Sequence, residues 1–167
     1  LKGEVDGATF LDEAIKNGAV ACVCEGVLDT IIPVVVVENA RKALSLICKN
    51  FYGGACDEFK IVMVTGTNGK TTTSYILYNI LQQNKTKCAL IGTNGIFVDN
   101  KQIYYGLTTP DPTELHYYFE VLKKMGVTHI VMEASAHAIK LNKLCGIKAK
   151  QIIFTNLTNE HLDYFGT

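Results

Sequence analysis

The stretch from residue 60 to residue 83 constrains the fold of this chain more than any other part of the sequence. It begins with the apolar run KIVMVT, passes through the glycine-rich loop GTNG, and continues into KTTTSYILYNILQQ. The first run is typical of a buried strand and the last of a helix. A strand that passes through a short loop into a helix is the repeating unit of α/β proteins, so we expect a parallel sheet here.

The sequence after residue 83 continues the same alternation. Its apolar runs are continuous, which indicates strands covered on both faces of a mostly parallel sheet. Asp99-Asn100 is a turn signal between two short runs, so residues 96–105 are expected to form a hairpin. The other predicted elements are strands at 87–92, 128–134 and 151–157, and a helix at 112–126 that Gly126 ends.

The first 57 residues predict a smaller α/β unit. We expect a helix at 9–17, short buried strands at 19–25 and 33–38, and a helix at 39–52 with Asn39 as its N-cap. The loop GGACDEF follows. We therefore predict a partial N-terminal domain over 1–57 and the start of a central domain over 58–167.

Composition excludes several functional classes. Acidic and basic residues balance at sixteen each, so charge gives no argument for nucleic acid or an anionic membrane. No apolar run approaches the roughly 20 residues of a membrane span. The six cysteines form no CxxC pair, which favours reduced core thiols over a zinc site. We expect a cytoplasmic monomer.

The loop at 66–69 predicts a phosphate site. Glycines let the backbone approach an anion closely, and the N–H groups at a helix N-terminus point toward it. Lys70 is placed to reach phosphate oxygens and Thr71 to bind Mg²⁺. The first glycine of the general Walker pattern is replaced by Val64, so a glycine turn without a ligand is the alternative.

Two side chains near the predicted strand ends are candidate metal ligands. Glu133 ends the run THIVME, and His161 follows the run QIIFTNL. Ligands bind at the carboxyl ends of strands in open α/β sheets, which favours both. A solvent-facing glutamate and a structural histidine are the alternatives, and we assign only a structural role to His116 and His129.

Several motifs in order give the chain a family resemblance. TGTNGKTT, IGTNG, TTPDP, MEASAHAI and FTNLTNEHLDYFGT together resemble the Mur ligase family, and the likeness extends over essentially the whole chain. TTPDP and EASAHA point to the members that add the third amino acid of the peptidoglycan stem peptide. The resemblance implies a P-loop ATPase-type central domain and an ATP-dependent ligase that acts on UDP-MurNAc-dipeptide through an acyl phosphate. The incoming amino acid would be lysine or meso-diaminopimelate.

The resemblance also implies roles for individual residues. Lys70 and His161 would be catalytic, Thr71 and Glu133 would bind one Mg²⁺, and His161 a second. The residues that would hold the ATP phosphates are Gly66, Thr67, Asn68, Gly69, Lys70, Thr71 and Thr72. Those that would contact the UDP-MurNAc-dipeptide are Thr108, Thr109, Ser135 and Lys143. Hydroxyls can orient substrate oxygens without adding charge, although local hydrogen bonds are the alternative.

The sequence departs from the family pattern after EASAHAI. Leu141 and Lys143 stand where the family commonly has Gln and Arg, and Ala136 stands where a second serine is common. Leu141 cannot donate or accept a hydrogen bond and is not assigned to the site. Lys143 keeps the charge without the bidentate geometry of Arg, so we retain it as an anion contact.

The resemblance places a carbamylated lysine and a C-terminal domain beyond Thr167, so we expect residues 1–167 alone to form no peptide bond. Two other functions stay open. One is a sister ligase such as folylpolyglutamate synthase, which shares the GxxGK loop. The other is a nucleotide-binding regulatory module without catalysis.

Overall fold

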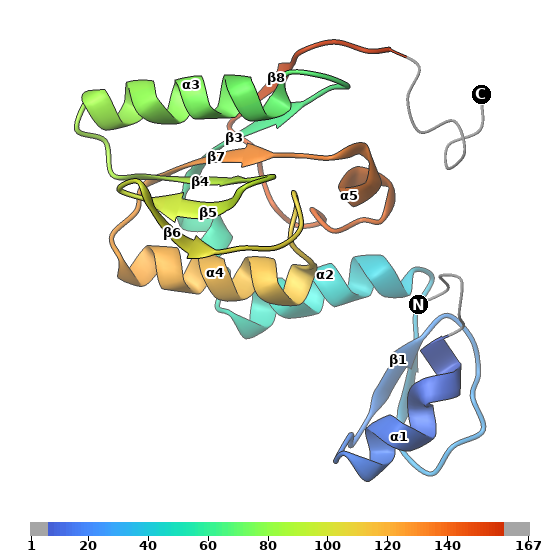
Figure 1. The fold of residues 1–167 in the computed structure, drawn as a ribbon. Helices are drawn as coiled ribbons and strands as arrows, with labels where there is room; N and C mark the ends of the chain where they lie inside the picture. Colours follow the sequence, from blue (N-terminus) through green and yellow to red (C-terminus); the bar gives the residue numbers. More distant parts are fainter. Residues whose placement is uncertain (1–6, 159–167) are drawn as a thin grey trace.

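The computed structural model describes residues 7–158, and its main body is a six-stranded sheet in the order β6-β5-β4-β7-β3-β8 (Figure 1). Four neighbouring strands, β4, β7, β3 and β8, run parallel, and β5 and β6 add an antiparallel hairpin at one side. This confirms the predicted mostly parallel α/β sheet. The strands are β3 (Lys60–Thr65), β4 (Cys88–Gly92), β5 (Gly95–Val98), β6 (Lys101–Tyr104), β7 (His129–Glu133) and β8 (Gln151–Phe154).

Helices cover both faces of this sheet. Helix α3 lies on one face against β3, β4 and β7, while α4 lies on the other with α2 packed against it (Figure 1). A short helix, α5, follows β7. The helices are α2 (Ala40–Phe51), α3 (Lys70–Gln83), α4 (Pro112–Lys124) and α5 (Ala136–Lys140).

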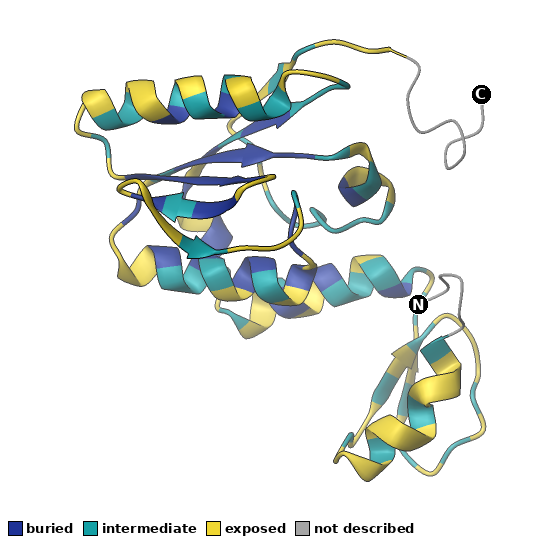
Figure 2. Ribbon diagram, in the orientation of Figure 1, coloured by how far each residue is buried: buried dark blue, intermediate teal, exposed yellow. Residues whose placement is uncertain are grey.

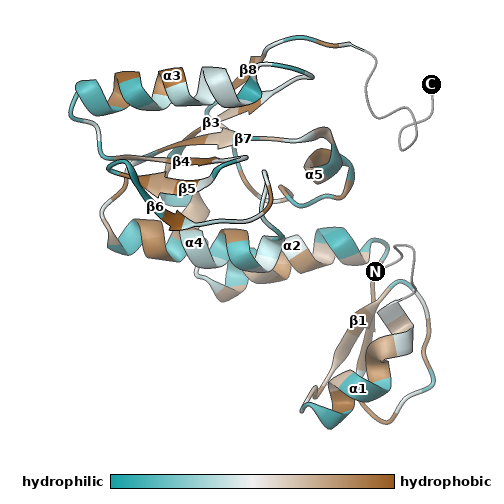
Figure 3. Cartoon of the chain, in the orientation of Figure 1, coloured by the Kyte–Doolittle hydropathy of each residue, from teal (hydrophilic) through white to brown (hydrophobic). Residues whose placement is uncertain are grey.

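The core divides into two apolar layers because successive side chains of a strand point to opposite faces. On β3, Ile61 and Met63 face α4 and join Phe119 of that helix, while Val64 faces α3 and packs with Tyr78. Strand β4 is buried along its length and β7 is buried after its first residue (Figure 2), and both are largely apolar in Figure 3. These strands form the buried platform under the site.

Two local predictions are confirmed by backbone geometry. Asp99 and Asn100 have φ values of 49° and 61°, as the tight turn of a hairpin requires. The Asn39 side chain accepts a hydrogen bond from the Lys42 N–H at 2.8 Å and caps α2.

The N-terminal unit is smaller and more exposed than the sequence predicts. It contains α1 (Leu11–Lys16), which follows a 3-10 turn at Gly7–Phe10, and a parallel pair of three-residue strands, β1 (Cys22–Cys24) and β2 (Val34–Val36). The prediction of buried strands is wrong here, because Val35 and Val36 are each 54% exposed. Two strands and one short helix have too little surface to cover both faces of the pair.

Helix α2 joins this unit to the main body and packs on the main body. The Ser45 hydroxyl donates to the Asn142 carbonyl at 2.7 Å, and the Lys49 ammonium donates to the Gly146 carbonyl at 2.8 Å. Beyond α2, a 3-10 turn (η2, Ala55–Glu58) contributes buried apolar side chains to the core under α4. The division at residue 57 stays a prediction.

Within residues 7–158, no helix is both long enough and apolar enough to cross a bilayer. Of the six cysteines, Cys48, Cys56 and Cys88 are buried, as expected for core thiols, while the other three are partly exposed.

The buried histidine of α4 gives a prediction about acid stability. His116 is 1% exposed, its Nε2 has no hydrogen-bond partner within the described residues, and burial lowers its pKa to about 4. The unfolded chain takes up this proton near pH 6.5, whereas the folded chain does not until about pH 4. The free energy of unfolding should therefore fall between these values as pH drops, by up to about 3 kcal/mol from this group.

Denaturant titrations at about pH 7 and about pH 4.5 test this, with His116→Leu expected to show a smaller pH dependence than the unmodified protein. His129→Gln, at the start of β7, is the control and should change the pH dependence less. An unchanged pH dependence in His116→Leu would contradict the assignment.

Candidate functional site

The site lies where the carboxyl ends of the four parallel strands meet. In open α/β sheets this edge is where ligands bind. Strand β3 leads into the loop at 66–69, β4 ends at Gly92 just before Thr93, β7 ends at Glu133, and β8 continues into residues 155–158.

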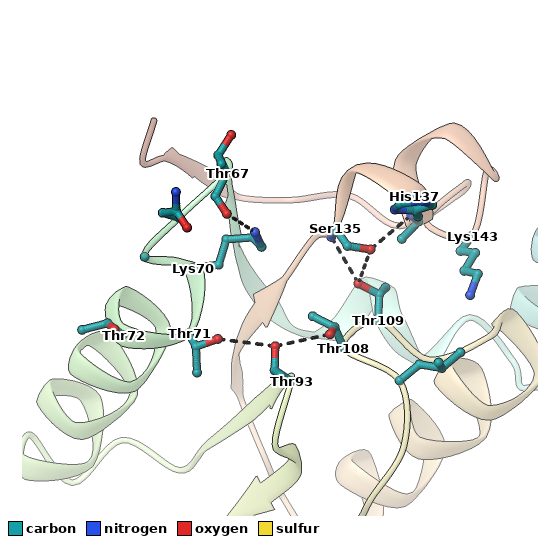
Figure 4. A pocket seen from close by; sticks show the side chains of 14 residues that line it. Thr67, Lys70, Thr71, Thr72, Thr93, Thr108, Thr109, Ser135, His137 and Lys143 are labelled. Atoms are coloured by element: carbon teal, nitrogen blue, oxygen red, sulfur yellow. Dashed lines mark hydrogen bonds between the residues drawn. The ribbon is translucent and has the colours of Figure 1, made fainter. Parts of the chain in front are cut away.

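A cavity of about 510 Å³ opens at this edge, and Figure 4 shows it from close by. It brings together the predicted phosphate loop and the predicted substrate contacts, which are up to 76 positions apart in sequence. The lining residues are Thr67, Asn68, Gly69, Lys70, Thr71, Thr72, Thr93, Leu107, Thr108, Thr109, Ser135, His137, Ala138 and Lys143. Of the other predicted site residues, Gly66 and Glu133 lie beside this lining, and His161 lies outside the described residues.

The phosphate loop is held in a conformation that suits glycine. Gly69 has φ 82° and immediately precedes α3, whose first-turn N–H groups have no partner in the preceding helical turn. Gly66 has φ 128°, and a Cβ there would lie 2.7 Å from the carbonyl oxygen of Asn156. The Lys70 ammonium curls back over the loop and donates to the carbonyls of Gly66 at 2.6 Å and Thr67 at 2.7 Å.

Glu133 is fully buried at the end of β7, and its carboxylate accepts three hydrogen bonds. The Thr71 hydroxyl donates to Oε2 at 3.0 Å, the Thr93 hydroxyl donates to the same oxygen at 3.0 Å, and the Thr93 N–H donates to Oε1 at 3.1 Å. The solvent-facing alternative is therefore wrong. Among the described residues no lysine, arginine or histidine forms an ion pair with this carboxylate.

Gly92, on the neighbouring strand, makes room for this carboxylate. A Cβ atom added at Gly92 would collide with the Glu133 side chain, because it would lie only 2.8 Å from the Cδ atom of Glu133. The backbone of Gly92 needs no positive φ, so the requirement for glycine here is one of space.

Thr93 is a site residue that sequence reasoning missed. Besides its two bonds to Glu133, its hydroxyl lies 3.4 Å from the Thr71 hydroxyl and 3.3 Å from that of Thr108. A row of three threonine oxygens thus crosses the cavity from α3 to the loop after β6 (Figure 4). The available signal was the motif IGTNG, whose threonine directly follows a buried strand.

Thr109 and Ser135 join a second set of hydrogen bonds. The Thr109 hydroxyl donates to the Glu133 carbonyl at 3.0 Å and accepts from the Ser135 N–H at 3.3 Å. The Ser135 hydroxyl accepts from the Ala138 N–H at 3.2 Å and so caps α5. These local bonds orient the two hydroxyls beside the cavity.

Lys143 lines the cavity but is already paired. Its ammonium lies 2.7 Å from Oδ1 of Asp111, the residue that precedes α4. Sequence reasoning did not foresee this partner. Leu141 is the C-cap of α5 and is not among the lining residues.

The donor set fits a hard cation and phosphates. Thr71 and Glu133 offer only oxygen ligands, which Mg²⁺ prefers, and a divalent cation bound beside them would balance the charge of the buried carboxylate. No cluster of three His, Cys, Asp or Glu forms within residues 7–158.

Of the histidines within residues 7–158, one lines the cavity and two lie away from it. His116 is buried under α4, and His129 starts β7 at the opposite end of the strand from the site, where its Nδ1 lies 2.8 Å from the Thr128 hydroxyl. His137, which was not predicted, lines the cavity from α5.

Comparisons with known proteins agree with this picture. Residues 64–167 match the family model described as Mur ligase middle domain. The chain is 39% identical over 170 residues to the UDP-N-acetylmuramoyl-L-alanyl-D-glutamate–2,6-diaminopimelate ligase of Clostridium perfringens, covering 100% of this chain and 35% of that protein. The chain thus spans about a third of the length of this relative.

Two solved structures are similar as well. One is a UDP-N-acetylmuramoyl-L-alanyl-D-glutamate–2,6-diaminopimelate ligase, with TM-score 0.84, 30% identity, and coverage of 95% of this chain and 32% of that one. The other is a MurF ligase from Thermotoga maritima in complex with ADP, with TM-score 0.58, 29% identity, and coverage of 100% and 36%.

The space at Gly92 gives a prediction about stability. In Gly92→Ala the new methyl group must displace the buried carboxylate of Glu133 and disturb its three hydrogen bonds. Overpacking of this kind costs about 1–3 kcal/mol, so the free energy of unfolding should fall by that amount in a denaturant titration.

Gly26→Ala is the matched control, because a Cβ there meets nothing within 4 Å and the backbone φ is not positive. Its effect should stay within about 0.5 kcal/mol. Equal stability of the two variants would mean that the Glu133 carboxylate does not need this space.

Proposed function

Because the chain belongs to the Mur ligase family, we propose that the complete protein is an ATP-dependent amide-bond ligase that adds the third amino acid to UDP-MurNAc-dipeptide through an acyl phosphate. The observation that carries this proposal is the single cavity shared by the phosphate loop and the hydroxyls of Thr108, Thr109 and Ser135. A phosphoryl donor and its acceptor must lie next to each other, and one cavity offers that proximity. The reaction would serve cell-wall synthesis in the cytoplasm, and with it cell shape and division.

We propose meso-diaminopimelate rather than lysine as the incoming amino acid. The relative from Clostridium perfringens and one of the two similar structures are named for 2,6-diaminopimelate. By family resemblance, the residues that select the amino acid belong to a C-terminal domain. Parallel assays of the full-length protein with each amino acid test the choice, and faster turnover with lysine would reverse it.

The nucleotide side of the cavity is assigned to the loop and to the start of α3. The N–H groups of the first helical turn and the Lys70 ammonium would hold the phosphate oxygens of ATP, which supplies the phosphoryl group. Lys70 is bonded to two neutral carbonyls, and it can exchange them for charged oxygens. The MurF ligase in complex with ADP is a related protein with a bound nucleotide.

A Mg²⁺ ion is assigned to Thr71 and Glu133, where it would neutralise charge on the phosphates. Thr93 supports this assignment because its two bonds fix the orientation of the Glu133 carboxylate. His161 is proposed to hold a second ion and is outside the described residues. In this scheme the protein contributes position and charge rather than a covalent bond to substrate.

The substrate side is assigned to Thr108, Thr109, Ser135 and Lys143. The hydroxyls would orient oxygens of the dipeptide, and Lys143 would face one of its anionic groups. The pairing of Lys143 with Asp111 limits how much charge it can offer, because the ammonium already has a carboxylate partner. We also propose that residues 1–57 are part of an N-terminal domain and that residues 58–167 are part of the central domain.

Lys70 provides the direct test of the phosphate assignment. In the full-length protein, Lys70→Ala should lower turnover at least about a hundredfold, since one charge-assisted contact strengthened in the transition state is lost. The fold should remain intact because the ammonium points over the loop and not into the core. Product formation and thermal unfolding are the two measurements.

Lys101→Ala, an exposed lysine of β6, is the control and should keep normal turnover. Near-normal turnover in Lys70→Ala would exclude a role for this lysine in phosphate binding.

Lys143 tests the substrate side. Lys143→Glu should raise KM for UDP-MurNAc-dipeptide several-fold or more, because a second carboxylate then faces Asp111 and the substrate anion. Lys143→Arg should leave KM equal or lower, because a guanidinium can bind a carboxylate with two hydrogen bonds. Steady-state kinetics of the full-length protein separate these outcomes.

Lys148→Glu makes the same charge change at an exposed position outside the cavity lining and should alter KM by less than about twofold. If Lys143→Glu behaves like this control, Lys143 is not a substrate contact.

A further inference from the structure

The four residues that follow β8, 155–158, run alongside the phosphate loop. The Thr67 N–H donates to the Asn156 carbonyl at 3.0 Å, and the Thr67 hydroxyl accepts from the Thr158 N–H at 3.0 Å. These contacts join positions about 90 apart in sequence. The phosphate loop is therefore held by the segment that follows β8 as well as by the conformation of its own glycines.

The Asn156 side chain makes the most specific of these contacts. Its Oδ1 accepts from the Asn68 N–H at 2.9 Å, and its Nδ2 donates to the Asn68 carbonyl at 3.0 Å. The amide thus pairs with both polar groups of one residue, as a neighbouring strand would. The Thr155 hydroxyl adds a third bond, to the Asn68 carbonyl, at 2.7 Å.

These bonds divide the loop into two parts with different tasks. The N–H groups of Thr67 and Asn68 are engaged by Asn156, whereas those in the first turn of α3 have no acceptor in a preceding helical turn. Gly66 belongs to the same contact, because a Cβ there would meet the backbone of Asn156 at 2.7 Å and 2.9 Å. The first half of the loop is therefore fastened to 155–158, and the second half is left for an anion.

We propose that Asn156 is a positioning residue that sets the phosphate loop for nucleotide binding, an inference that rests on the ligase function proposed above. By fixing the Asn68 peptide, it holds Gly69 and the first turn of α3 where their N–H groups meet the phosphates. Thr67 and Asn68, which the family resemblance places among the phosphate residues, would then contribute by holding the loop in position, because their N–H groups are bonded to Asn156. Asn156 itself touches neither ATP nor the dipeptide.

The test uses the full-length protein and its kinetics with both substrates. Asn156→Ala removes two hydrogen bonds to Asn68, so KM for ATP and Kd for MgATP should rise about tenfold. KM for UDP-MurNAc-dipeptide should stay within about twofold, and the unliganded melting temperature should change little because Asn156 is exposed. A purely structural role would lower the melting temperature and affect both substrates alike.

Two further variants complete the design. Thr155→Val keeps shape but removes the hydroxyl donor to Asn68, so it should weaken MgATP binding by a smaller factor even if Asn156→Ala fails to fold. Thr158→Val is the matched control, because Thr158 contacts Thr67 only through backbone atoms in these bonds, and it should bind MgATP normally.

The outcomes separate the two proposals. Unchanged MgATP affinity in Asn156→Ala and Thr155→Val, with normal binding by the unmodified protein, overturns the positioning role alone. If the unmodified protein neither binds MgATP nor forms product, the ligase function fails and the positioning role fails with it.

Discussion

The buried carboxylate of Glu133 is the constraint on which the arrangement of the site depends. The oxygens of a buried carboxyl group must be satisfied by hydrogen bonds, and here donors come from two other segments of the chain. Thr71 ties it to the start of α3, and Thr93 ties it to the end of β4. The Glu133 carbonyl also accepts from Thr109, so the loop before α4 is fastened to the same residue. One residue thus sets the relative positions of the phosphate loop and the hydroxyls across the cavity.

The elements that could be predicted from sequence are those with strong local signals. Strand β3 and helix α3 have the predicted bounds because an apolar run, two glycines and a helical pattern follow one another without a break. The β5–β6 turn followed from two residue types that tolerate positive φ. The burial of β1 and β2 was predicted wrongly, because composition reports that a strand is apolar but not whether anything lies on it. Helix α5 was missed because five residues are too few for a periodic pattern.

The same difference applies to the site. Residues that lie in local motifs could be predicted, whereas contacts between residues distant in sequence could not. The loop residues and the hydroxyls of Thr108, Thr109 and Ser135 lie in motifs, and the structure brings them to one cavity. Thr93 and Asn156 also lie in motifs that follow strands, but their bonds join residues 40 and 88 positions apart, and no local pattern reports such pairings. The Asp111 partner of Lys143 was missed for the same reason.

The two cavity lysines differ in how readily each can meet an anion. Lys70 is bonded to neutral carbonyls, which a charged phosphate oxygen can replace with a gain in electrostatic energy. Lys143 is bonded to a carboxylate, so an incoming anion must share the ammonium with Asp111 or displace it. The turn that bears Lys143 is also braced from α2, through Ser45 to Asn142 and Lys49 to Gly146, which restricts its movement away from Asp111. In the proposed scheme the stronger anion site of the cavity is therefore the phosphate loop, and the opposite wall would position a substrate through hydroxyls more than through charge.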